Sequence, residues 1–128
     1  MQTAEQLDRE ARNAAKNYQG EFAGFTVLFG LAVLAAYIAV PAFVVAGSLP
    51  LVVGALLMIV LTYMSYTVVH DAAHGSISGS HQKLRWVNEL MGYLTAWIMA
   101  IPLTAHRFEH LTHHRNTNDP TPRLLFLM

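Results

Sequence analysis

The sequence predicts an all-α integral membrane protein, and two observations lead to that prediction. The chain of 128 residues is 54% hydrophobic and only 12% charged, whereas soluble domains are about 25% charged. Residues 22–46 and residues 51–69 contain no charged side chain, and a helix needs about 20 apolar residues to cross a bilayer. We therefore expect an N-terminal transmembrane hairpin, then an in-plane or re-entrant helix, then a cytosolic helix that carries histidines.

The first 21 residues are polar and rich in helix formers, so we expect an exposed cytosolic leader helix that ends near Gly20. Gly47-Ser48-Leu49-Pro50 joins the two apolar stretches as a tight turn, which makes the two spans antiparallel. All eight Lys and Arg residues lie outside this turn. The positive-inside rule then predicts that the N-terminus and everything after Val69 are cytoplasmic.

Charge and cysteine content exclude several classes of function. The formal net charge is zero, so the chain lacks the electrostatic footprint of a nucleic-acid-binding protein. It contains no cysteine, which excludes disulfides, thiolate zinc sites and cysteine nucleophiles.

The first pair of histidines follows the second apolar stretch. His70 and His74 are four residues apart and share one face of a helix. Neutral imidazole is the commonest protein metal ligand, so this pair can share one ion or flank two. Asp71 can orient a ring by a hydrogen bond, and Gly75 can end the helix. Taken alone, this pair is better explained as two interfacial histidines that face lipid headgroups.

Residues 84–105 form the ambiguous segment, after a loop at residues 75–82. The segment is apolar, but it carries Arg85, Asn88 and Glu89 at its start and Pro102 near its end. If it crossed the bilayer, the histidines on its two sides would lie more than about 30 Å apart. We therefore predict a re-entrant or in-plane amphipathic segment, with interfacial aromatic residues at Trp86, Tyr93 and Trp97.

A second cluster of histidines occupies residues 106–114 and contains His106, His110, His113 and His114. On a helix, these four rings point within an arc of about 100°. Glu109 can hold a ring in one tautomer. The two clusters together predict a shared metal site, whereas His81 lies in the loop and we expect it to be exposed.

The two clusters resemble the histidine boxes of the membrane fatty acid desaturase and hydroxylase family. His70-Asp71-Ala72-Ala73-His74-Gly75 looks like the first box, and His110-Leu111-Thr112-His113-His114, with Arg107 before it and Asn118-Asp119-Pro120 after it, looks like the second. The resemblance covers residues 22–120. It implies a helical membrane enzyme with a cytosolic di-iron site that uses O₂ and electrons from ferredoxin or cytochrome b5 to desaturate, hydroxylate or ketolate acyl chains or carotenoids. It implies iron ligands at His70, His74, His110, His113 and His114. His106 has no counterpart in the box pattern, and its position on the same helical face is the only support for it as a ligand.

Three alternatives remain open from the sequence. Carotenoid ketolases and hydroxylases have boxes of similar spacing. A third box and a second hairpin follow the second box in the family, so we expect this chain to be truncated before the third box and inactive alone, and a non-catalytic membrane remnant is one reading. A zinc metallopeptidase fits less well, because Asp71 stands where that motif has a glutamate general base.

Overall fold

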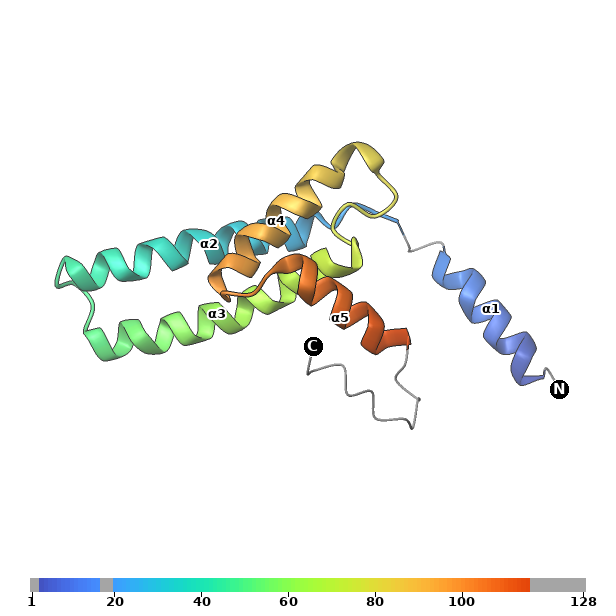
Figure 1. Cartoon of the computed structure of the whole chain (residues 1–128), viewed down its shortest axis with the longest axis horizontal. Coiled ribbons are helices and arrows are strands. Elements are labelled where there is room, and N and C mark those ends of the chain that lie inside the picture. Colours follow the sequence, from blue (N-terminus) through green and yellow to red (C-terminus); the bar gives the residue numbers. More distant parts are fainter. Residues whose placement is uncertain (1–2, 17–19, 116–128) are drawn as a thin grey trace.

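The computed structural model describes residues 3–16 and 20–115 of the chain (Figure 1). The described residues contain only helices, which confirms the all-α prediction. In order, these are α1 (Ala4–Lys16), α2 (Gly24–Val45), α3 (Leu51–His74), the short 3₁₀ helix η1 (Gln82–Leu84), α4 (Arg85–Ile98) and α5 (Leu103–Arg115). The Asn118-Asp119-Pro120 segment and the apolar residues that end the chain lie outside the described residues.

Helix α1 corresponds to the polar leader. Thr3 and Gln6 form a capping box at its start: the Gln6 backbone N–H donates to Thr3 Oγ1, and the Thr3 N–H donates to Gln6 Oε1 at 2.9 Å. Among the described helices, α1 packs against none of the others. The first turn of α1 is therefore stabilised by these capping hydrogen bonds and not by packing against another helix.

Helices α2 and α3 form the predicted hairpin, joined by a turn in which Gly47 has a φ of +73°. Their 22 and 24 residues correspond to lengths of about 33 Å and 36 Å, enough to cross a bilayer. Only 11% of the most apolar window of α2 and 28% of that of α3 are buried inside the protein, whereas a core helix of a soluble protein is mostly buried. Both helices are therefore long and apolar enough to cross a membrane, and most of their apolar surface is not covered by the rest of the described structure.

The core lies at the histidine end of the hairpin, where α4 and α5 pack on α3. Its fully buried side chains come from α3, from the following loop, from α4 and from α5: Val68, Val69, Ala72, Ile77, Met91, Ala96 and Leu103. Gly92 allows α4 to approach α3 closely, since a Cβ there would lie 2.7 Å from the Ala72 Cβ. The distal half of the hairpin, toward Gly47, has few such contacts.

The segment predicted as one unit at residues 84–105 is divided in the structure. Helix α4 ends at Ile98 and α5 begins at Leu103. Ala100 takes a left-handed conformation with a φ of 55°, and the Ile101 N–H donates to the Ala96 carbonyl, as in a Schellman cap. Pro102 follows and has no N–H to continue the helix. The chain therefore runs back along α3 in α4, a helix of about 21 Å that is too short to cross a bilayer, and returns toward the histidine end in α5 (Figure 1).

The loop after α3 is tied to the start of α2. The Ala23 N–H donates to the Ile77 carbonyl, and the Ser80 N–H donates to the Gly20 carbonyl, both at 3.0 Å. Gly79 fits because its φ is +53° and a side chain there would collide with the Gly20 backbone. These contacts fix the two ends of the hairpin that lie beside the histidines.

Candidate metal site

The first histidine pair occupies the last turns of α3. Helix α3 continues five residues past the predicted span, which ended at Val69, so that His70 and His74 belong to the same helix as the apolar stretch. Gly75 then ends it, as predicted: its φ is 71°, its N–H donates to the Ala72 carbonyl, and the next N–H donates to the Asp71 carbonyl. The pair is therefore held on a regular helix rather than on a loop.

The second cluster lies along α5, beside the end of α3. His74 Nε2 lies 2.9 Å from His110 Nε2, which lies 3.1 Å from His114 Nε2. The His70 ring centroid is 4.7 Å from those of both His74 and His110. One nitrogen from each of these four rings can be chosen so that all lie within 4.8 Å of one another. Four imidazoles from segments 36 residues apart in sequence thus converge on one volume.

These nitrogen separations fit a metal ion. Two imidazole nitrogens bound at about 2.1 Å and at right angles lie about 3.0 Å apart, and two opposite ligands lie about 4.2 Å apart. The separations of 2.9 Å and 3.1 Å match adjacent ligands of one ion. The upper limit of 4.8 Å leaves room either for a second ion or for a small closure of the rings. Among the described residues, the donor set is made of imidazoles, which suit iron, copper and zinc.

The electrostatics of the cluster favour neutral rings. Burial of the His110 ring lowers its pKa, and so do the positive charges that His70, His114, His74 and His106 would carry. A ring must be neutral at the ligating nitrogen to bind a metal, so the lowered pKa keeps His110 competent as a ligand at a more acidic pH than an ordinary histidine.

The other histidines lie at the edge of this group or outside it. The His106 ring stacks on His110 with centroids 5.4 Å apart, and its Nε2 is buried without a hydrogen-bond partner in the described structure. The His113 ring lies 6.0 Å from that of His114 and is exposed. Neither belongs to the converging four. His81 is exposed in the loop, as predicted.

The two carboxylates expected to orient rings behave differently. Asp71 Oδ1 lies 3.5 Å from His70 Nδ1, and its Oδ2 accepts a hydrogen bond of 3.0 Å from the Thr26 hydroxyl of α2. Asp71 therefore connects a box histidine to the first span. Glu109 is exposed on α5 and, within the described residues, bonds to none of the histidine rings.

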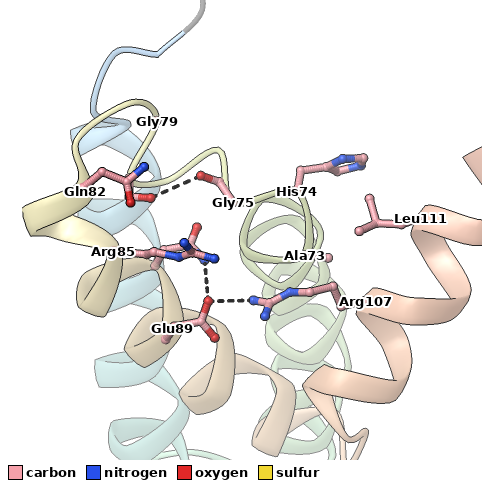
Figure 2. A pocket seen from close by; sticks show the side chains of 11 residues that line it. Ala73, His74, Gly75, Gly79, Gln82, Arg85, Glu89, Arg107 and Leu111 are labelled. Atoms are coloured by element: carbon pink, nitrogen blue, oxygen red, sulfur yellow. Dashed lines mark hydrogen bonds and ion pairs between the residues drawn. The ribbon is translucent and has the colours of Figure 1, made fainter.

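A polar pocket of about 280 Å³ next to His74 contains residues that the sequence analysis did not single out as functional. Figure 2 shows Glu89 of α4 and Arg107 of α5 pointing toward one another across it, and His74 at its rim. The signal that could have found them is chemical. A carboxylate such as that of Glu89, within an apolar segment, needs a positively charged partner. The chain has only eight Lys and Arg residues that could serve as that partner.

A comparison with known protein families matches the part of the chain that carries both histidine boxes. The sequence model of the family described as fatty acid desaturase matches residues 46–124. The sn-1 acyl-lipid omega-3 desaturase (ferredoxin) of Nostoc sp. (strain 36) is 37% identical over 54 residues, which are 42% of this chain and 14% of that protein. The sn-1 oleoyl-lipid 12-desaturase of Anabaena variabilis is 34% identical over 53 residues, 41% of this chain and 14% of that protein.

The matched stretch therefore spans 14% of the length of each of these two relatives. No solved structure matches the chain. The family match nevertheless covers more than half of the chain and includes both histidine boxes. Two apolar helices that end at a cluster of metal-competent histidines, together with this match, establish that the chain belongs to the fatty acid desaturase family.

Proposed function

We propose that this chain forms the histidine-box segment of a membrane-bound, O₂-dependent acyl-lipid desaturase and binds iron through its histidines. The observation that supports this most is the convergence of four ring nitrogens, from the end of α3 and from α5, within 4.8 Å. His70, His74, His110 and His114 are the proposed principal ligands, and His113, as the next ring on α5, is the proposed fifth. Iron held there would supply the oxidation of the acyl chain by O₂.

The protein's own residues hold and orient this site. Asp71 links His70 to Thr26 of α2, so that the first span supports the ring. Tyr66, one turn before His70 on α3, places its ring 6.2 Å from that of His70 and 5.9 Å from that of His106. These aromatic contacts pack Tyr66 against two of the histidine rings.

The names of the relatives support a proposal for the substrate and the electron donor. Both relatives are named as acyl-lipid or oleoyl-lipid desaturases, and one is named with ferredoxin. This favours an acyl chain of a membrane lipid over a carotenoid, and a ferredoxin-type donor over cytochrome b5. Because every Lys and Arg lies outside the turn at residues 47–50, we propose that the histidines face the cytoplasm, where such a donor is found.

An exchange of segments tests this proposal. The stretch of the Nostoc relative that corresponds to residues 70–114 is replaced by those residues of this chain, and lipids of cells that express the chimera are analysed for desaturated acyl chains. We expect the chimera to retain desaturation, His110→Ala in it to abolish the product, and His81→Ala to leave it unchanged. A chimera that inserts into the membrane and binds iron but yields no desaturated lipid would contradict the proposal.

A further inference from the structure

A polar network joins α3, α4 and α5 at the level of the histidines. Arg107 Nη2 donates to the Ala72 carbonyl at 3.1 Å and to Glu89 Oε1 at 2.9 Å. Asn88 Nδ2 donates to the same two oxygens, at 3.1 Å and 3.3 Å. The four groups close a ring in which α3 supplies a carbonyl, α4 supplies an amide and a carboxylate, and α5 supplies the guanidinium. Figure 2 shows the pair of Glu89 and Arg107 within it.

The network involves residues of α3 and α5 that neighbour the histidines in sequence. Ala72 stands midway between His70 and His74 on α3, and Arg107 stands between His106 and His110 on α5. A slip of α5 by one turn would move its residues about 5.4 Å along the axis. That shift exceeds the separations of 2.9 Å and 3.1 Å that join His110 to His74 and His114. The histidine cluster therefore depends on the register of α5 against α3. The contact of Arg107 with the Ala72 carbonyl of α3 fixes that register.

The chemistry of this contact requires an arginine. The side chains of Arg107 and Glu89 are only 28% and 35% exposed, and Asn88 is 1% exposed. A planar guanidinium presents several donors in a fixed geometry and can reach a carbonyl and a carboxylate at once. A lysine keeps the charge but loses that fixed fork. Removing the guanidinium would leave the half-buried Glu89 carboxylate without its ion pair and the Ala72 carbonyl with one donor fewer.

We propose that Arg107 is a positioning residue: held by Glu89 and Asn88, it sets the register of α5 on α3 and so brings His110 and His114 to His74. The proposal rests on the proposed function in that these histidines bind a metal. Within the part of the chain that the structure describes, Arg107 hydrogen-bonds to Ala72 and Glu89 and to none of the histidine rings, so it acts through the placement of α5.

The test uses Co²⁺, whose visible absorption reports its coordination, added to the purified protein in detergent. Wild type, Arg107→Ala, Arg107→Lys and Arg115→Ala are compared with all histidines intact. We expect Arg107→Ala to bind Co²⁺ at least about tenfold more weakly, with a changed spectrum, and Arg107→Lys to recover only part of the loss. Arg115 is the matched control, since it is exposed at the end of α5, and its replacement should change neither affinity nor spectrum.

A distance measurement separates this proposal from the proposed function. Spin labels at the exposed positions Tyr63 and Phe108 report the placement of α5 on α3 without metal, and Arg107→Ala should shift or broaden that distance. If wild type binds no Co²⁺ but the distance shifts, the proposed function fails and the role of Arg107 stands. If the distance in Arg107→Ala equals that of wild type, or if wild type binds Co²⁺ and the variant binds it with the same affinity and spectrum, the role of Arg107 is overturned. Should this variant fail to fold, Arg107→Gln with Glu89→Gln removes both charges together and is measured in the same way.

Discussion

The individual histidines of the second box differ in their surroundings, although the sequence pattern treats them alike. His110 lies at the centre of the cluster, within 3.1 Å of two other ring nitrogens. His113 is exposed and its ring is 6.0 Å from the nearest described neighbour in the box, His114. A helix turns by about 100° per residue, so adjacent rings such as His113 and His114 point in different directions even when the pattern groups them.

We expect this difference to appear in metal binding. Replacing His110 with Ala should weaken Fe²⁺ binding more strongly than replacing His113 with Ala, because His110 contributes a nitrogen to the converging group. Anaerobic Fe²⁺ titration of the two variants against wild type measures it. A larger loss in the His113 variant would show that α5 turns its box differently when the metal binds.

Protonation should weaken the site in acid. The pKa of His110 is lowered by burial and by the neighbouring His70, His114, His74 and His106, so the unfolded chain takes up a proton near its ordinary pKa of about 6.5 before the folded chain does. Stability should therefore fall as the pH drops below about 6.5, and metal affinity should fall with it. Thermal unfolding in detergent from about pH 7.5 to about pH 5.5 measures the effect. His110→Ala should flatten this dependence, and an unchanged slope would refute the assignment.

At the scale of the helices, the packing of α4 on α3 depends on a small residue. A Cβ at Gly92 would lie 2.7 Å from Ala72 Cβ and 2.9 Å from Leu103 Cδ2. Gly92→Ala should therefore lower the free energy of unfolding by about 1–3 kcal/mol, as overpacking does. Gly24→Ala is the control, because its nearest atoms are at an ordinary 3.8 Å. Denaturant titration in micelles compares the two, and equal stabilities would mean that α4 is not pressed against α3.

The elements differ in how far the sequence could predict them. The hairpin of α2 and α3 could be predicted from two charge-free stretches joined by a short turn. Each stretch is long and apolar enough for a membrane-spanning helix, and the short turn makes the two helices antiparallel. The end of α3 at Gly75 follows from one residue. The break between α4 and α5 lies at residues 99–102, before the boundary that the sequence predicted after residue 105. Its position depends on the left-handed conformation of Ala100, which the residue type does not predict. The pair of Glu89 and Arg107 joins residues 18 apart on different helices, and only the packing of those helices brings them together.

At the scale of the whole molecule, the account requires both ends of the hairpin on one side of the membrane. Single cysteines at Ser48 and at Ser80, in a chain that has none of its own, test this by labelling in intact cells with a reagent that does not cross membranes. We expect Ser48→Cys to be labelled and Ser80→Cys to be protected, because every Lys and Arg lies away from the Ser48 turn. Equal labelling of the two positions would rule out the hairpin.

The central claim is that α3 and α5 contribute to one metal site rather than to two. Titration of Fe²⁺ into wild type, His74→Ala, His110→Ala and the double variant tests it most directly. If the rings share ions, each single variant loses affinity by about tenfold or more, and the double variant loses clearly less than the sum of the two changes in binding free energy. Additive losses, with each single variant keeping an intact site on the other helix, would contradict the shared site.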